Sequence, residues 1–147
     1  MAITLQIAPL KTLPPQISEL RDEAANEGFR FIEKLIAEWE SGTNRFDQPG
    51  ECFLGAFTGA DLIGVGGLNR DPYVGVGTTG RIRHLYVRRL ARGQGVGSAL
   101  LRRLLDQANV AFDRVRLRTD TREAAAFYLS HGFLSVADET ASHAKVL

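Results

Sequence analysis

A short glycine-rich stretch, Arg92-Gly93-Gln94-Gly95-Val96-Gly97-Ser98, constrains this chain more than any other feature. It follows a strand-like run, 82–87, and leads into a run whose apolar residues recur at helical spacing. The predicted helix therefore begins inside the glycines. Its first N–H groups lack intrahelical partners and carry the positive end of the helix dipole, and glycine lets a phosphate oxygen approach the backbone. The sequence thus predicts a pyrophosphate site at a strand-to-helix junction.

Two common phosphate-binding motifs do not fit this stretch. A dinucleotide-binding start needs Gly or Ala where Ser98 stands and an acidic residue ending the next strand, whereas Asp113 precedes that strand. A P-loop needs a Gly-Lys-Ser/Thr sequence, and the lysine is missing. A plain tight turn is the alternative reading of the glycines alone. The pattern that remains is Arg/Gln-x-x-Gly-x-Gly/Ala, filled by Arg92, Gly95 and Gly97.

A second motif lies about 25 residues downstream, where residues 124–133 read Ala-x-x-x-Tyr-x-x-x-Gly-Phe. With both motifs at this separation, the chain resembles the GNAT superfamily of acetyl-CoA-dependent N-acetyltransferases. The resemblance covers residues 50–147 well and the first 50 residues only in their general pattern. It implies an α/β fold in which a mixed central β-sheet of about seven strands is flanked by four helices.

Size predicts a single domain over residues 1–147, and the resemblance implies that it is an N-acetyltransferase domain. A net charge of +1, from 18 basic and 17 acidic residues, does not mark a nucleic-acid or membrane binder. A local arginine cluster is the exception, and its alternative reading is a solvated edge. The only cysteine, Cys52, excludes an internal disulfide and paired cysteine metal ligands, so we expect no metal and a cytoplasmic location.

Apolar periodicity and turn residues predict alternating strands and helices, as expected for a mixed sheet with helices on both faces. The expected elements are a strand 3–7, helices 14–25 and 29–40, strands 52–57 and 62–68, a central strand 82–87, a helix from 96, a strand 115–119, a helix 121–131, and short strands 133–136 and 144–147.

The resemblance also implies where the cofactor lies. In this family the central strand splays from its neighbour, and the pantetheine arm of acetyl-CoA pairs with the exposed backbone. The Val87 N–H would then face the thioester carbonyl as an oxyanion donor. The implied cofactor-binding residues are Leu85, Tyr86, Val87, Arg92, Gly93, Gln94, Gly95, Val96, Gly97, Ser98, Thr121 and Tyr128.

Two of these residues carry specific expectations. Tyr128 matches the family's tyrosine that protonates the leaving thiolate, so it is the expected catalytic residue beside Val87. A phenol of pKa about 10 gives up its proton reluctantly to a thiolate of about 8.5, so its value lies in a hydrogen bond that strengthens as sulfur gains charge. Thr121 stands where family members usually carry Asn, which puts its cofactor contact in question.

The sequence does not identify the general base. An amine of pKa about 10.4 must lose a proton before it attacks, and some relatives place a Glu where this chain has Arg81. Regular strand alternation sets Arg81 and Arg83 on the face of Val87, and His84 on the opposite face. His84 is therefore interpreted as a structural histidine. Glu51 or a chain of waters are the alternatives that stay open.

The two arginines on the expected face of Val87 lead to a hypothesis about the acceptor. Arg81 and Arg83 would repel a polyamine but could grip a carboxylate or another anion through charge-assisted hydrogen bonds. Pairing of both arginines with nearby acidic residues is the competing interpretation. The sequence itself does not name the acceptor.

The resemblance implies an enzyme that moves acetyl from acetyl-CoA to a primary amine of an unidentified, small-molecule acceptor. The resemblance implies direct attack in a ternary complex. A CoA-binding regulatory module without transferase activity is the runner-up, and a nucleic-acid binder is least favoured. Dimers are common in the family, so a homodimer is considered, although no residue pattern fixes the oligomeric state.

Overall fold

The computed structural model describes residues 4–75 and 78–147. Its elements follow the order expected from the sequence, with an added 3₁₀ turn (Arg89–Ala91) before the third helix. The elements are β1 (Leu5–Pro9), α1 (Ile17–Asn26), α2 (Phe31–Ser41), β2 (Cys52–Thr58), β3 (Asp61–Arg70), β4 (Thr79–Val87), α3 (Val96–Ala111), β5 (Arg114–Leu117), α4 (Arg122–Ser130), β6 (Leu134–Ser135) and β7 (His143–Val146). Residue 3, expected in the first strand, lies outside the described residues.

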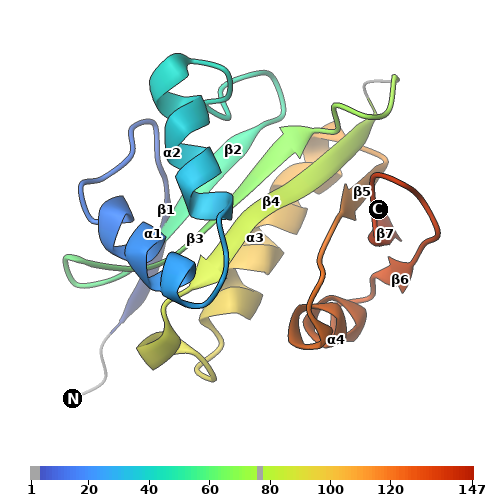
Figure 1. The fold of residues 1–147 in the computed structure, drawn as a ribbon. Coiled ribbons are helices and arrows are strands. Elements are labelled where there is room, and N and C mark those ends of the chain that lie inside the picture. The colour runs from blue at the N-terminus through green and yellow to red at the C-terminus, as the bar shows by residue number, and fades with distance from the viewer. Residues whose placement is uncertain (1–3, 76–77) are drawn as a thin grey trace.

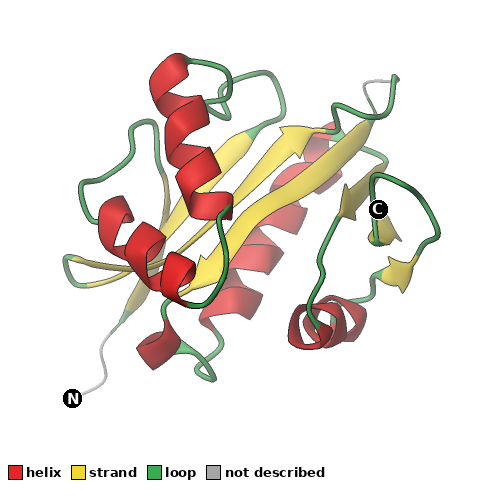
Figure 2. Cartoon of the chain, in the orientation of Figure 1, coloured by secondary structure: helices red, strands yellow, loops and turns green. Residues whose placement is uncertain are grey.

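The seven strands form one mixed sheet in the order β1-β2-β3-β4-β5-β7-β6 (Figures 1 and 2). Neighbouring strands run antiparallel except β4 and β5, which are parallel. Over the residues that the structure describes, the α/β class, the seven-stranded sheet and the four helices are therefore confirmed. The single parallel pair requires a crossover connection, which α3 supplies.

Helices cover both faces of the sheet. In Figure 1, α1 and α2 lie in front of the strands and α3 lies behind them. Behind the sheet, Leu100, Leu101 and Leu104 of α3 are fully buried, and Tyr128 of α4 belongs to the same apolar cluster. Burying a leucine side chain stabilises the fold by about 1.5–3 kcal/mol, so this face firmly anchors the helix that follows the glycine loop.

The central strand begins three residues earlier than the sequence pattern indicated. Gly80 was expected in a loop, but it pairs with Arg70 and Val115 inside the sheet. A Cβ at Gly80 would lie 2.8 Å from the Phe112 ring. This glycine therefore allows close packing of a helix end against a strand and does not mark a turn.

Candidate active site

Strands β4 and β5 separate after a short paired segment. Among the described residues, they pair where Thr79–Arg81 faces Arg114–Arg116 and nowhere further along β4. Strand β4 continues to Val87, whereas β5 ends at Leu117, and Figure 1 shows the two strands diverging. A groove of about 1230 Å³ lies along this open edge, bounded by β4, the glycine loop and α4. The splay that the family resemblance implied is thus present.

A bulge interrupts β4 at its centre. Val65 pairs with Tyr86, but Gly67 pairs with Arg83, so two β4 residues stand opposite Gly66. The first of them, His84, has φ +59°. The inserted residue reverses the alternation of side chains beyond this point.

The sequence prediction about the faces of β4 was therefore wrong. Arg83 pairs with Glu38 of α2, and Tyr86 contacts α1, so both lie on the face covered by these helices. Leu85 and Val87 pack on the other face, against the cluster around α3. His84 shares the face of Arg83, since its ring packs against aromatic rings on the α2 side.

The backbone of β4 presents polar groups to the groove. The Arg88 N–H donates to Ile63 O of β3 at 2.8 Å. Because backbone groups alternate along a strand, the preceding Val87 N–H points to the opposite, open edge. The Val87 carbonyl also lies on this side and accepts a 2.9 Å hydrogen bond from Arg92 Nε. The orientation of Val87 therefore agrees with its expected role as a backbone donor.

The glycine loop ends where predicted, with α3 starting at Val96. Gly95 is its N-cap at φ +83°, a conformation that glycine adopts without steric cost. Within the part of the chain that the structure describes, the N–H groups of Val96, Gly97 and Ser98 have no acceptor. A Cβ added at Gly93 or Gly95 would meet nothing within 4 Å. The loop thus forms an open cradle of backbone donors.

Side chains of the loop are less free than its backbone. The Arg92 guanidinium donates to Glu27 Oε2 at 2.8 Å and Oε1 at 2.6 Å. This bidentate pair lowers the pKa of Glu27 to about 2. Ser98 Oγ lies 3.0 Å from His131 Nε2. Arg92 therefore ties the loop to α1, and a phosphate would meet mainly backbone N–H groups.

Tyr86 belongs to the same anchoring network. Its hydroxyl lies 2.7 Å from Glu23 Oε1 and 2.6 Å from Glu27 Oε1. Burial and the two carboxylates raise the pKa of Tyr86. Any contribution of Tyr86 to cofactor binding therefore comes from its backbone. The sequence analysis missed Glu27, although Glu19, Glu23 and Glu27 follow one another at the four-residue spacing of a helix face.

Tyr128 of α4 lies in the wall of the groove and is 8% exposed. Burial raises the pKa of its phenol, so the hydroxyl stays protonated and can donate a hydrogen bond. Among the described residues, this hydroxyl has no hydrogen-bond partner. Thr121 also lines the groove, but its hydroxyl caps α4 by accepting from Ala124 N at 3.2 Å.

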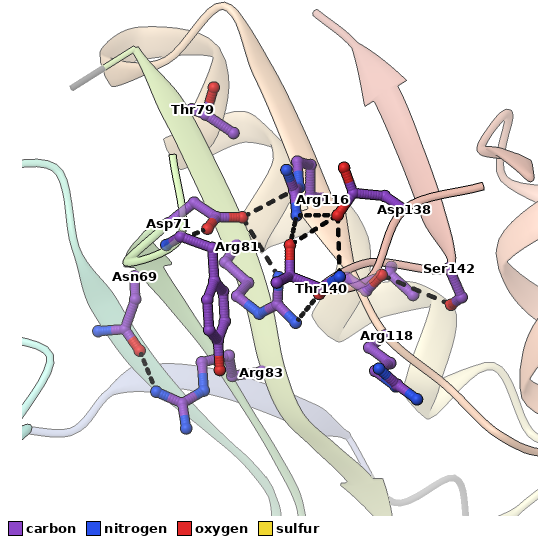
Figure 3. Close-up of polar contacts among 12 residues, drawn as sticks. Asn69, Asp71, Thr79, Arg81, Arg83, Arg116, Arg118, Asp138, Thr140 and Ser142 are labelled. Atoms are coloured by element: carbon purple, nitrogen blue, oxygen red, sulfur yellow. Dashed lines mark hydrogen bonds and ion pairs between the residues drawn. The ribbon is translucent and has the colours of Figure 1, made fainter. Parts of the chain in front are cut away.

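A second cavity, of about 460 Å³, adjoins the groove and shares Lys34, Arg81 and Arg83 with it. Arg81 is not free there: it lies 3.3 Å from Asp71 Oδ2 and donates to Thr140 O at 2.7 Å (Figure 3). Arg83 makes two longer contacts, 3.4 Å each, to Glu38 and Asn69. The arginines thus pair locally, as the competing interpretation held, and Arg83 is held less tightly.

Glu51, one of the open alternatives for the base, lies in this second cavity. Its Oε2 accepts from Asn69 Nδ2 and Arg70 N, both at 2.9 Å, and its Oε1 accepts from Gln48 N at 3.1 Å. The carboxylate is therefore occupied in holding the loop before β2. It does not line the groove that contains Tyr128.

The fold and groove agree with what comparison with known proteins shows. Residues 15–133 match the family model described as the acetyltransferase (GNAT) family. The chain belongs to this family. A protein of Exiguobacterium sp. 255-15 named as a candidate acetyltransferase shares 27% identity, with a TM-score of 0.87 over 98% of this chain and 94% of its own. PH1933 of Pyrococcus horikoshii OT3, at 22% identity and a TM-score of 0.78 over 98% of this chain and 99% of its own, shares the fold.

A curated relative of this GNAT protein is the N-alpha-acetyltransferase RimI of Mycobacterium tuberculosis. The two are 34% identical over 93 residues, which is 60% of this chain. The match spans 56% of RimI, little more than half of that relative's length. The family match places the chain among the GNAT acetyltransferases, a family that uses acetyl-CoA.

The structure fits the family's cofactor in two respects. The open edge of β4 offers backbone groups to an extended arm, and the unpaired N–H groups at the start of α3 suit a pyrophosphate. The described residues contain no cluster of His, Cys, Asp or Glu suited to a metal ion. In the same residues, no helix combines the length and apolar character needed to cross a bilayer.

Proposed function

We propose that this GNAT enzyme transfers the acetyl group of acetyl-CoA to a primary amine of a small-molecule acceptor, by direct attack in a ternary complex. One observation carries the proposal: the open edge of β4, the cradle of N–H groups and Tyr128 line a single groove, and a second, polar cavity adjoins it. A cofactor in the groove and an acceptor in the adjoining cavity would therefore lie next to each other.

The chain's residues have separate tasks in this proposal. Acetyl-CoA supplies the thioester, and the cradle at Gly93–Ser98 binds its pyrophosphate through backbone N–H groups. The Val87 N–H stabilises negative charge on the thioester oxygen. Tyr128 donates a hydrogen bond to the departing sulfur, because burial keeps its phenol protonated.

The acceptor belongs in the smaller cavity, whose charged lining distinguishes it from the more apolar groove. Lys34 and Arg83 supply positive charge there, while Glu38 and Glu51 supply negative charge. A mixed lining of this kind suits an acceptor that carries both an amine and an anionic group. We retain the acidic-amine hypothesis for Arg83, with Lys34 in place of the ion-paired Arg81.

The α-amine of a polypeptide N-terminus is the second candidate acceptor, favoured by the partial match to RimI. Acetylation assays on a panel of amino acids, other small amines, polyamines and peptides separate the two. We expect thiol release from acetyl-CoA that depends on a small amine, with the N-acetyl product identified by mass spectrometry. Release only with peptides would favour the second candidate, and no amine-dependent release would contradict acetyl transfer to amines.

A further inference from the structure

His84 combines three features that each cost the fold free energy. It is 8% exposed, it lies inside the β4 bulge, and its φ of +59° is in the left-handed region. Among the described residues, Phe46, at φ +56°, is the only other non-glycine residue in that region. The two rings contact each other edge to face, with centroids 6.0 Å apart. Backbone strain of this kind concentrates at functional sites.

The ring of His84 also lacks hydrogen-bond partners. Both Nδ1 and Nε2 are buried, and no described residue bonds to either. The other two histidines differ, since His131 contacts Ser98 at 3.0 Å and His143 contacts Ser142 at 2.8 Å. A structural histidine is expected to be satisfied, because a buried unpaired donor or acceptor is unfavourable. A phenylalanine would suit the aromatic surroundings without this cost.

The His84 ring lies close to the expected position of the acceptor. His84 lines the groove, and its neighbour Arg83 lines both the groove and the acceptor cavity. The bulge places both on the same sheet face. Phe31, at the start of α2, stacks over the ring with centroids 6.3 Å apart and is itself partly exposed on the groove wall. The ring thus lies in the groove wall beside a residue that also lines the acceptor cavity.

We propose that His84 binds the acceptor's attacking nitrogen, with one ring nitrogen accepting a hydrogen bond from the amine N–H so that the amine lone pair faces the thioester. This role rests on the acetyl transfer proposed above and names a group that contacts the substrate. Regular strand alternation had disfavoured His84 as the base, and the bulge removes that objection.

The charged residues around His84 determine the protonation states of its imidazole ring and of the acceptor amine. Burial, together with Arg83 on β4 and Lys34 on α2, lowers the pKa of His84 to about 3. The imidazole is therefore neutral at physiological pH, and its lone pair is available. The same cations disfavour an ammonium ion beside the ring, although Glu38 of α2 partly offsets Arg83. The neutral amine binds, and His84 orients it without becoming charged.

The transfer then balances without an additional base. The C–N bond forms as the C–S bond breaks, and one proton of the neutral amine ends on sulfur. The products are the N-acetyl amide and free CoA thiol. His84 is in the same charge state before and after the step.

The test compares His84→Phe and His84→Asn with His143→Asn, a buried histidine away from the groove. We expect His84→Phe to have a Tm at or above wild type and unchanged acetyl-CoA affinity, but a kcat/KM for the amine at least 30-fold lower. Asn tolerates a positive φ and offers a carbonyl acceptor, so His84→Asn should regain part of the activity. His143→Asn should lower Tm and leave kcat/KM near wild type.

A second measurement separates this proposal from the proposed function. The ring resonances of the histidines are followed by NMR in the acetyl-CoA complex as glycinamide is added. A shift confined to His84 supports the contact even if no amine in the panel is acetylated. A folded His84→Phe or His84→Asn with wild-type kcat/KM, or a His84 ring unaffected by glycinamide and by every accepted amine, overturns the proposal.

Discussion

Asp71→Asn should destabilise the fold strongly, because it removes a buried carboxylate that contacts two buried guanidinium groups. The Asp71 side chain is 0% exposed, and those of Arg81 and Arg116 are 9% and 8% exposed. Asp71 Oδ2 lies 3.3 Å from Arg81 Nη1 and 3.2 Å from Arg116 Nε (Figure 3). Asn preserves the shape and the Oδ1 acceptor for Tyr73 N, so the substitution changes charge and little else.

The expected magnitude follows from this burial. Breaking a buried ion pair by removing one partner costs about 3–5 kcal/mol, since the remaining charge stays uncompensated. For 147 residues, an unfolding entropy of about 2.1 cal/mol/K per residue converts this loss into a Tm decrease of about 10–16 °C. Urea and thermal unfolding followed by circular dichroism measure both quantities.

Asp138→Asn is the matched control for Asp71→Asn. Asp138 contacts the same Arg116, at 3.5 Å, but its side chain is 47% exposed. Water screens this pair, so we expect a Tm close to wild type. If Asp71→Asn also unfolds near the wild-type temperature, with a loss of under about 1 kcal/mol, the two guanidiniums are solvated after the substitution and the reasoning from burial is refuted.

Three further predictions concern binding and catalysis. Gly95→Ala should weaken CoA binding at least tenfold by calorimetry, because its Cβ projects into the open cradle; Gly59→Ala, with a similar positive φ and equally open space, carries the same strain and should bind CoA normally. If the Gly95→Ala and Gly59→Ala variants bind CoA with equal affinity, the cradle does not bind the pyrophosphate. Tyr128→Phe should lower kcat by on the order of 10²-fold with unchanged acetyl-CoA affinity, and a near wild-type kcat would assign the proton to another donor. Arg83→Ala should raise KM for acidic amines about tenfold. An unaltered KM, or a preference for polycations, would refute the acidic acceptor.

The features that the sequence predicted well depend on residues close together in the chain. The start of α3 at Val96 follows from glycines and an apolar stripe within one segment, and the structure begins the helix there. The buried face of this helix was also predictable from the spacing of its apolar residues. The structure confirms it, because Leu100, Leu101 and Leu104 are fully buried. Local propensity and packing agree here, so neither overrides the other.

The partners of charged residues were not predictable in the same way. Arg92 was expected to bind the pyrophosphate, yet its guanidinium pairs with Glu27, 65 residues earlier in the chain. Arg81 was expected to face the acceptor, yet it pairs with Asp71 in a buried cluster. Which acid faces which arginine depends on how α1 and the β3–β4 connection pack on the sheet. The sequence supplied only the competing interpretation that such pairs exist.

The wrong prediction with the largest consequence for function was the assignment of β4 side chains to the two faces of the sheet. The bulge in β4 caused this error, and a residue of the neighbouring strand β3 indicates the bulge. Neither of the two bulge positions, His84 and Leu85, is a glycine that would indicate a bulge. The sequence of β4 therefore predicts regular alternation of side chains between the two faces. Strand β3, however, places Gly66 directly opposite, and a Cβ there would come within 3.0 Å of Leu85 and 3.1 Å of Leu104. A glycine inside a strand indicates a bulge or a close approach of another segment. Because one inserted residue moves every later side chain to the other face, reading Gly66 in this way would have returned His84 to the candidates for contact with the acceptor.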